Sequence, residues 1–315
     1  MKRLWIALLT VASAAAQAQN YPERAVHFVI PYPPAGTSDN LGRLLAEKLR
    51  PALGQPIVVD NKPGGTSSLG AELVAQAKPD GYTLLLGPMT AFSVLPHLRK
   101  LPFDPAASFE PVSMVAQYLA IVTVRNDLPV ASFAELVAYA RKNPGKLSYG
   151  SAGIASFGNM AGETIKLREK VDLLHVPFKG SGDLVAALLG RQIDLFIDGV
   201  GLPLAKSGKA RAVAIFASVR HPDLPDVPSL PEAGLKARIP SSWWGIFAPK
   251  GTPAAIVQRL ESEFARIVAD GDTRERMSRI SVVPFYLSSA EMRKMMKEDS
   301  DINAELIRST GMRLE

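Results

Sequence analysis

Four short segments rich in glycine and small or hydroxyl-bearing residues mark where this sequence could do chemistry. They span residues 33–38, 87–92, 150–158 and 179–182, and each follows an apolar run typical of a strand. One such segment alone is more often a simple turn, but four at strand ends favour a binding role. Small residues let a ligand approach the backbone, and N–H groups at a helix start carry partial positive charge. The pattern therefore predicts an anion-binding site, with hydroxyl donors from Thr37, Ser38, Thr90, Ser151, Ser156 and Ser181.

Residues suited to catalysis are poorly arranged by comparison. Ser156 has Ile154 where the nucleophile elbow Gly-x-Ser-x-Gly needs its first glycine. Gly65–Gly70 has the glycine spacing of a phosphate loop, but Ala71 replaces the required lysine. None of the four histidines has a second metal ligand at zinc-site spacing, and His175 is interpreted as a core residue. We therefore expect no enzyme activity, no metal and no cofactor.

Asp198 leaves two interpretations open. It follows the apolar segment 194–197 and precedes Gly199. Such an aspartate is often only a turn residue, and it could instead face a ligand's amine, hydroxyl or bound water. Trp243 and Trp244 favour core packing over ligand stacking.

The elements that position these segments alternate between strand-like and helix-like runs. Val26–Ile30 reads as a strand, and Asp39 can cap a helix that runs to about Leu53 and stops at Gly54. Capping boxes at Ser132-x-x-Glu135 and Ser288-x-x-Glu291 open two further helices. The alternation predicts βαβ units with parallel sheets, and hence an α/β fold.

An internal similarity suggests two lobes. Residues 29–39 resemble residues 175–183, because both read as strand, proline-aromatic, glycine-hydroxyl, aspartate and then helix. We expect two α/β lobes, each presenting a similar loop above its sheet. Residues 19–119 together with 222–315 would form lobe 1, and residues 120–221 would form lobe 2.

The start of the chain predicts export. Lys2 and Arg3 precede a short apolar run, and Ala16-Gln17-Ala18 fits a signal-peptidase site, so residues 1–18 read as a signal peptide. The absence of cysteine excludes a lipid anchor at that site and any disulfide. Positive charges are scattered without a basic tract, which argues against nucleic acid. We expect a soluble periplasmic monomer.

Many segments in the same order resemble the substrate-binding receptors of the tripartite tricarboxylate transporter family, also called the Bug family. The matching segments are Pro31–Asp39, Asp60–Gly64, Pro79–Gly87, Asn143–Gly153, His175–Gly180, Leu224–Pro228 and Ala248–Pro253. The resemblance implies a type II periplasmic-binding-protein fold, with two α/β lobes and a ligand cleft between them. It also implies capture of a dicarboxylate, tricarboxylate, acidic amino acid or aromatic acid. The partner would be a transporter with one large and one small integral-membrane subunit.

By motif, the resemblance and the loop pattern together give the candidate ligand-binding residues. They are Tyr32, Ala35, Gly36, Thr37, Asp39, Thr90, Ser151, Ala152, Ser156, Phe157, Lys179, Gly180 and Asp198. In the family, the loop after the first strand holds a ligand carboxylate, and hinge closure of the second lobe over the ligand would give a form that the membrane partner reads.

Three departures from the family pattern are visible. Ala35-Gly36 replaces paired glycines, the stretch after Gly153 contains Ile154 and Phe157 in place of polar residues, and Gly199 replaces asparagine after Asp198. The added apolar surface suggests a ligand with an apolar or aromatic body rather than citrate. A sensory co-receptor and, as a weaker alternative, an exported hydrolase remain the rival functions.

Overall fold

The computed structural model describes residues 21–235, 239–280 and 282–313, which form two compact units. Unit 1 comprises the described residues of Met1–Phe92, Leu101–Ala116 and Trp243–Met296. Unit 2 comprises those of Ser93–Lys100, Gln117–Ser242 and Lys297–Glu315. The segment read as a signal peptide lies outside the described residues. Within the described part of the chain, no helix combines the length and the apolar character needed to cross a membrane.

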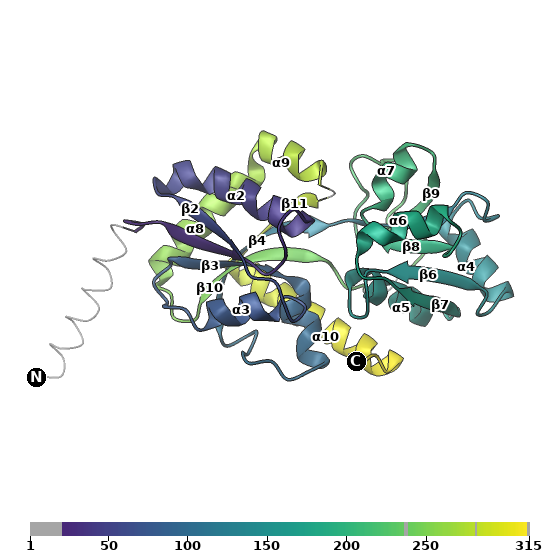
Figure 1. Ribbon diagram of the computed structural model, residues 1–315, viewed down its shortest axis with the longest axis horizontal. Helices are drawn as coiled ribbons and strands as arrows, with labels where there is room; N and C mark the ends of the chain where they lie inside the picture. Colours follow the sequence, from purple (N-terminus) through teal and green to yellow (C-terminus); the bar gives the residue numbers. More distant parts are fainter. Residues whose placement is uncertain (1–20, 236–238, 281, 314–315) are drawn as a thin grey trace, which may run out of the picture. The chain divides into compact units, whose positions relative to one another are not determined.

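Unit 1 is built on a six-stranded sheet in the order β11-β4-β10-β3-β1-β2. β1 pairs in parallel with β2 and β3, while β10 runs antiparallel to β3. Helices α2, α8 and α9 lie on one face, and α3 lies on the other (Figure 1). The strands are β1 (Val26–Ile30), β2 (Ile57–Asn61), β3 (Thr83–Pro88), β4 (Phe109–Tyr118), β10 (Trp243–Pro249) and β11 (Val282–Ser288). The helices are α2 (Thr37–Leu53), α3 (Ser68–Ala75), η1 (Thr90–Val94), α8 (Ala254–Ala269) and α9 (Gly271–Ser278).

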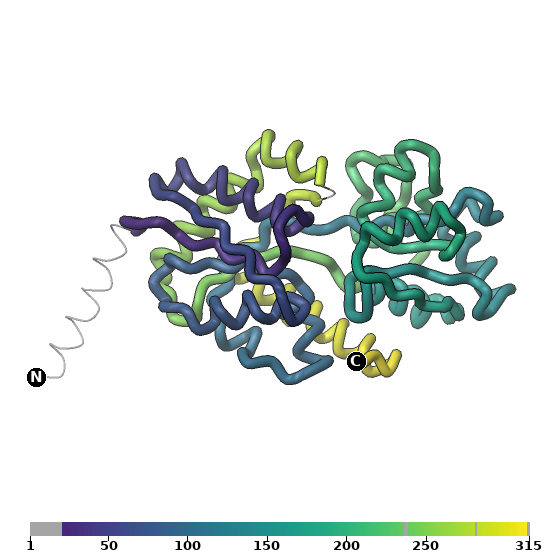
Figure 2. The backbone as a smooth tube through the Cα atoms, in the orientation of Figure 1, coloured from purple at the N-terminus to yellow at the C-terminus, as the bar shows by residue number. Residues whose placement is uncertain are grey.

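Unit 2 is built on a five-stranded sheet in the order β7-β6-β8-β5-β9. β6 pairs in parallel with β7 and β8, while β5 runs antiparallel to β8 and β9. The strands are β5 (Ala120–Arg125), β6 (Leu147–Ser151), β7 (Leu173–Pro177), β8 (Leu195–Asp198) and β9 (Ala210–Phe216). The helices are η2 (Leu95–His97), α4 (Phe133–Lys142), α5 (Phe157–Glu169), α6 (Ser181–Leu189) and α7 (Gly201–Lys206). In Figure 2 the teal and green part of the chain traces this unit. The last helix, α10 (Ser289–Thr310), begins in unit 1 and ends in unit 2.

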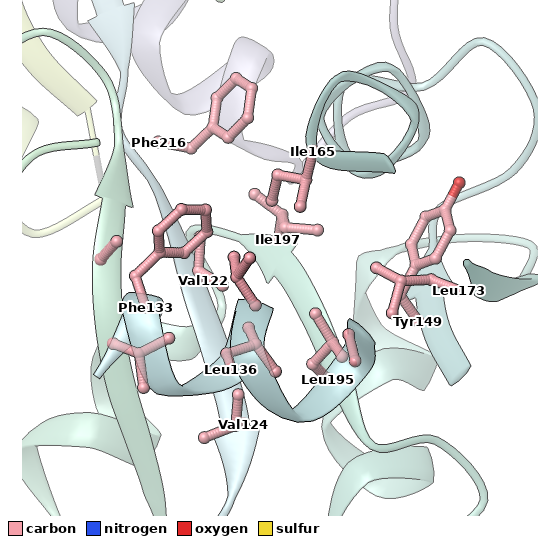
Figure 3. Close-up of a cluster of buried hydrophobic side chains, with 14 of the residues drawn as sticks. Val122, Val124, Phe133, Leu136, Tyr149, Ile165, Leu173, Leu195, Ile197 and Phe216 are labelled. Carbon is pink, nitrogen blue, oxygen red and sulfur yellow. The ribbon is translucent and has the colours of Figure 1, made fainter. Parts of the chain in front are cut away.

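Two apolar layers sandwich the sheet of unit 2. On one face, Phe133 and Leu136 from α4 and Ile165 from α5 point toward Val122 and Ile197 of the sheet (Figure 3). On the other face, α6 and α7 supply a smaller cluster that includes Leu184, Leu188 and Leu204. Burial on both faces fixes where the strands end, and therefore where the loops that follow them emerge.

The predicted α/β class and the end of the first helix agree with the structure, but the helix begins at Thr37 after Gly36, so Asp39 lies in its first turn and does not cap it. α2 ends at Leu53, and Gly54 caps it in the left-handed conformation at φ 68°. Both sheets are mixed rather than wholly parallel, because β10 and β5 enter them in the opposite direction. Neither β4 nor β11 was predicted as a strand.

Candidate functional site

The loop between β1 and α2 is held by a side chain from the first turn of the helix. Ala35 lies in the left-handed region at φ 66°, and its backbone N–H donates to Asp39 Oδ2 over 2.8 Å. Gly36 follows as the residue before the helix, with extended backbone and no side chain to cap it. The loop from Pro33 to Gly36 is exposed, whereas Asp39 is buried. The buried Asp39 carboxylate therefore fixes the conformation of the exposed loop.

Asp39 collects charge-assisted hydrogen bonds from two further residues. Arg43 Nε donates to Oδ2 over 2.9 Å, and Asn61 Nδ2 donates to Oδ1 over 2.8 Å. Burial by itself raises the pKa of this carboxyl, but the bonds from Arg43, Asn61 and Ala35 outweigh it and hold the pKa below its ordinary value. Asn61 also donates to the Tyr32 carbonyl over 3.1 Å. Asp39 is thus an ionised anchor whose acceptors are used within unit 1.

Tyr32 connects three strand-end loops. It follows β1, and the side chains of Ser67, before α3, and Thr90, after β3, are near enough to its phenol to lower its pKa in part. Burial raises the pKa of the phenol, so it remains a neutral donor. The parallel strands β1, β2 and β3 end at the same edge of the sheet, which is why these loops meet.

The first turn of α2 presents unpaired backbone donors. Within the part of the chain that the structure describes, the N–H groups of Gly36, Thr37 and Asp39 make no hydrogen bond to protein, and the first bond of the helix is from Asn40 to Gly36. Trp244 Nε1 donates to Ser38 Oγ over 3.0 Å, which fixes the opposite side of this turn against β10. Backbone N–H groups of this kind at the start of a helix can bind an anion.

Unit 2 repeats the same loop construction after β6. Ala155 lies at φ 63°, and its N–H donates to Asn159 Oδ1 over 3.0 Å. Ser156 caps α5 by accepting from the Asn159 N–H over 3.3 Å. Asn159 holds the third helical position, as Asp39 does in α2. The two loops differ in one charge, because an amide replaces the carboxylate.

The topology confirms that these two loops are the equivalent ones. β1 and β6 each lie between two parallel partners, and each leads through a loop and a helix to the neighbouring strand. The similarity noted between residues 29–39 and 175–183 instead pairs the loop after β1 with the loop after β7. The two segments that are similar in sequence are therefore not the two loops that occupy equivalent positions in the sheets.

Ser151 belongs to a buried polar cluster behind the loop after β6. Its hydroxyl lies 2.7 Å from His175 Nε2 and donates to the Gly153 carbonyl over 3.0 Å. His175 stacks on Tyr149 with ring centroids 4.8 Å apart, and burial lowers the pKa of His175. Ser151 is fully buried, so the pair serves as a support for the loop rather than as an exposed nucleophile.

Asp198 lies at the end of β8 and is held by three donors. Tyr118 Oη donates to Oδ1 over 2.5 Å, Ser181 Oγ donates to Oδ2 over 2.7 Å, and the Val200 N–H donates to Oδ1 over 3.1 Å. The Gly199 N–H donates to the Tyr118 hydroxyl over 2.5 Å. A Cβ at position 199 would lie 2.6 Å from that hydroxyl, which explains a glycine here.

The loop between β7 and α6 supplies the remaining donors. Lys179 is exposed, and Gly180 precedes the helix in an extended conformation with φ −175°. Among the described residues, the N–H groups of Gly180, Ser181 and Gly182 make no hydrogen bond to protein. The start of α6 therefore resembles the start of α2, because in both the first backbone N–H groups have no hydrogen bond to the described residues.

The structure thus distributes the predicted residues over two sets of loops. Tyr32, Ala35, Gly36, Thr37, Asp39 and Thr90 lie at one sheet edge in unit 1, and Ser151, Ala152, Ser156, Phe157, Lys179, Gly180 and Asp198 lie at the strand ends of unit 2. Asp39, Ser151 and Asp198 are buried and bonded within their own unit. Phe157 is half-buried and packs edge-on against Phe216 and Tyr118. Its ring is largely used in packing, which weakens the suggestion of an aromatic-binding surface there.

Sequence reasoning missed Tyr118, Asn159 and Asn61. Tyr118 ends a strand that was not predicted, and Asn159 is an ordinary polar residue within a helix. Both loops have an alanine four residues before the aspartate or asparagine that accepts its N–H, at Ala35 and Asp39 and at Ala155 and Asn159. This repeated spacing in the sequence could have indicated Asn159. Within the described residues, no group of three or more histidine or acidic side chains could hold a metal ion.

Two α/β units whose strand-end loops present free backbone amides define a solute-binding receptor of the type II periplasmic-binding-protein fold. Residues 41–312 match the family described as "Tripartite tricarboxylate transporter family receptor". The chain belongs to this family of periplasmic solute-binding receptors, which are not enzymes.

Solved structures agree with this assignment. The periplasmic binding protein BugD is 35% identical, with a TM-score of 0.77 over 94% of this chain and 100% of its own. Rpa4515 of R. palustris, solved with adipate, is 31% identical with a TM-score of 0.80 over 93% and 99%. MatC of Rhodopseudomonas palustris, solved with bound malate, is 30% identical with a TM-score of 0.76 over 91% and 100%.

Proposed function

We propose that this protein is a periplasmic receptor that captures a small organic dicarboxylate and delivers it to a tripartite tricarboxylate-type membrane transporter. In this proposal, residues 1–18 direct export and are removed, and the mature receptor works with one large and one small membrane subunit. The proposed carboxylate donors are the backbone N–H groups at the start of α2 in unit 1 and at the starts of α5 and α6 in unit 2.

One observation carries the proposal. The loops before α2 and α5 each contain an alanine with positive φ whose backbone N–H donates to the side chain of the third helical residue. These bonds run from Ala35 to Asp39 and from Ala155 to Asn159. After Ala35 the N–H groups of Gly36, Thr37 and Asp39 have no partner among the described residues, as at anion-binding helix starts. After Ala155 the Ser156 N–H donates to the Gly153 carbonyl over 3.2 Å, and the N–H groups of Phe157 and Gly158 are the ones without a partner in the described part of the chain. A construction repeated in both units is explained by ligand binding more simply than by stability.

The reported ligands of two relatives support a dicarboxylate. Rpa4515 was solved with adipate and MatC with malate, and both are dicarboxylic acids. The exposed Lys179 adds a positive charge next to the start of α6, which favours anions.

Calorimetry with purified receptor tests the proposal. The panel would contain succinate, glutarate, adipate, malate, citrate and two aromatic acids, with thermal shift as a second measurement. At least one dicarboxylate is expected to bind with micromolar or better affinity and to raise Tm. Absence of binding by every acid would contradict the proposal.

Two measurements in cells test export and delivery. Mass spectrometry of the periplasmic fraction should detect a chain that begins near Gln19 or Asn20. Uptake of the bound acid should fall in a strain that lacks this receptor and return when the receptor is supplied. Unchanged uptake, together with loss of a transcriptional response to the acid, would indicate a sensory role instead.

A further inference from the structure

The loop between β6 and α5 is connected to an acidic side chain by a chain of hydrogen bonds. Glu163 lies on α5, four residues after Asn159, and Asn159 is the residue whose side chain accepts the Ala155 N–H. Tyr149 of β6 joins these two side chains, because its hydroxyl bonds to both. All four residues belong to unit 2. The direction in which each bond donates determines how the loop is held.

Tyr149 donates its single hydroxyl hydrogen to Glu163. The bond to Glu163 Oε1 is 2.7 Å long, and Lys166 Nζ donates to the same oxygen over 3.0 Å. An ionised carboxylate accepts hydrogen bonds and donates none. Burial, and then the neighbouring Glu163 charge, raises the pKa of Tyr149 far above its ordinary value, so the phenol keeps its hydrogen. The Tyr149 oxygen is therefore left as an acceptor for any other partner.

The Tyr149 ring is fixed from two sides. It is fully buried and stacks on His175 with ring centroids 4.8 Å apart and an interplanar angle of 25°. On α5, a Cβ added at Gly162 would lie 2.2 Å from Tyr149 Cε2, so the ring lies directly against the helix backbone. The hydroxyl is thus held in one place and cannot turn away to find another partner.

The fixed phenol sets the orientation of the Asn159 amide. Asn159 Nδ2 donates to the Tyr149 oxygen over 3.0 Å, which leaves Asn159 Oδ1 to accept the Ala155 N–H over 3.0 Å. The flipped amide would place its NH2 group against the Ala155 N–H and its oxygen against the Tyr149 oxygen. Asn159 is only 3% exposed, so water would not compensate for these lost bonds. One orientation is therefore strongly favoured.

The oriented amide holds the loop in an unfavourable backbone conformation. Ala155 lies at φ 63°, which costs free energy for an alanine. Its bond to Asn159 offsets that cost, and α5 then begins with the N–H groups of Phe157 and Gly158. These two donors have no partner within the described part of the chain. Their position therefore depends on the Asn159 amide.

Unit 1 solves the same problem with a different arrangement of charge. There Asp39 accepts the Ala35 N–H directly with a carboxylate, and the cation Arg43 follows four residues later. The third residue of β1 is Phe28, which has no hydroxyl, whereas the third residue of β6 is Tyr149. In unit 2 the acidic group is therefore one side chain further from the loop, and Tyr149 transmits its influence.

From these contacts we infer that Glu163 and Tyr149 are positioning residues for the backbone amides at the start of α5. Glu163 directs the Tyr149 hydroxyl, Tyr149 orients the Asn159 amide, and Asn159 holds Ala155. No ligand contact by these side chains is needed for this role. The inference rests on the proposed function in its last step, in which the amides at the start of α5 bind the ligand.

Two variants break the chain at different points. Tyr149→Phe keeps the packed ring and removes the hydroxyl, and Glu163→Ala removes the acceptor that directs it. In both, exchange of the Ala155 amide hydrogen, followed by NMR, should become at least about tenfold faster, as expected for loss of one hydrogen bond. Amides of α4 serve as an internal reference and should exchange as in the native receptor. Calorimetry should show that Kd for the bound dicarboxylate rises at least about fivefold.

Two further variants are the controls. Glu163→Gln keeps an oxygen that can accept from Tyr149, so it should bring Ala155 exchange and Kd to within about threefold of the native values. Tyr139→Phe removes a hydroxyl from a half-buried tyrosine of the same unit, outside the chain, and should change neither quantity. If Glu163→Gln loses as much as Glu163→Ala, a directed bond from Tyr149 does not explain the effect and the inference is wrong.

The two measurements separate failure of the inference from failure of the proposed function. Native Ala155 exchange in both Tyr149→Phe and Glu163→Ala would overturn the inference, whatever the ligand affinity. Faster exchange with an unchanged Kd would also overturn it, because the amides at the start of α5 would then not bind the ligand. If the native receptor binds no acid, the proposed function fails, and with it the last step of the inference, while the exchange rates still decide whether Glu163 and Tyr149 orient Asn159.

Discussion

The backbone N–H of Ala35 donates to Asp39 Oδ2 over 2.8 Å, although Ala35 adopts a positive φ of 66°. Positive φ is unfavourable for alanine, so a bond of this kind has to hold the residue there. The first-turn side chain is thus part of the loop's structure, and the N–H groups of Gly36 and Thr37 that follow have no partner among the described residues.

Replacing Asp39 should therefore destabilise the loop and unit 1. Asp39→Ala leaves the Ala35 N–H, Arg43 and Asn61 without their acceptor, and we expect a loss of about 2–3 kcal/mol in the free energy of unfolding. Asp39→Asn should lose less than half as much, because Asn159 makes the equivalent bond in unit 2. Urea unfolding measures both, and a change below about 0.5 kcal/mol for Asp39→Ala would refute the anchoring role.

Removing one backbone donor should weaken ligand binding without unfolding the receptor. Thr37→Pro deletes the N–H of the first residue of α2, where proline fits a helix. The preceding Gly36, at φ −82° and ψ 174°, already has the conformation that proline requires before it. We expect Kd to rise at least about tenfold, the value of one charge-assisted hydrogen bond.

Two variants control the Thr37→Pro experiment. Thr37→Ala keeps the N–H and removes only the hydroxyl. Gly271→Pro makes the same change at the first residue of α9, outside the candidate loops, after Asp270 at φ −65° and ψ 134°. Gly271→Pro should bind nearly as the native receptor does, and Thr37→Ala measures the contribution of the Thr37 hydroxyl by itself, so that the loss due to the N–H can be separated from it. Equal affinity of Thr37→Pro and native protein would mean that this amide does not contact the ligand.

Gly162 should tolerate no side chain. A Cβ there would lie 2.2 Å from Tyr149 Cε2, and Tyr149 is fully buried, bonded to Glu163 and stacked on His175. Gly162→Ala should lower the free energy of unfolding by about 1–3 kcal/mol through overpacking. Gly271→Ala, with no atom within 4 Å of the added Cβ, is the matched control and should be neutral. Similar stability of the two variants would show that the Tyr149 ring moves freely.

Acidification should destabilise the receptor through His175. Burial lowers the pKa of His175 in the folded state below its ordinary value of 6.5. The unfolded chain therefore takes up the proton first, so stability is full above about pH 6.5 and falls as pH decreases toward the folded-state pKa. His175→Gln should show a shallower decline in unfolding free energy between pH 7 and 5. Burial also lowers the pKa values of His97 and His221, so these two residues should keep part of the pH dependence of the unfolding free energy in the variant. If the unfolding free energy of His175→Gln falls with pH as steeply as that of the native receptor, His175 does not cause the loss of stability in acid.

Local features of the fold were accessible from the sequence. The strand Val26–Ile30, the helix that ends before Gly54 and the capping box at Ser132 depend on residues close together in the chain, and each is present. β4 was missed because it is buried along most of its length and contains Pro111, so it lacks the alternation typical of a strand. β11 was missed as well.

The sequence by itself determined the alternation of strands, loops and helices apart from β4 and β11, the membership of the family, and the small-residue loops that precede α2, α5 and α6. Only the tertiary structure decided what these loops do with their polar side chains. Tyr118 and Asp198 are 80 residues apart, and Ser151 and His175 are 24 apart. Such pairs meet because sheet order brings distant strand ends together, and no local pattern records which ends those are. Burial places Asp39, Ser151 and Asp198 inside their own units as supports, and the backbone amides without a partner among the described residues are the groups proposed to bind the ligand.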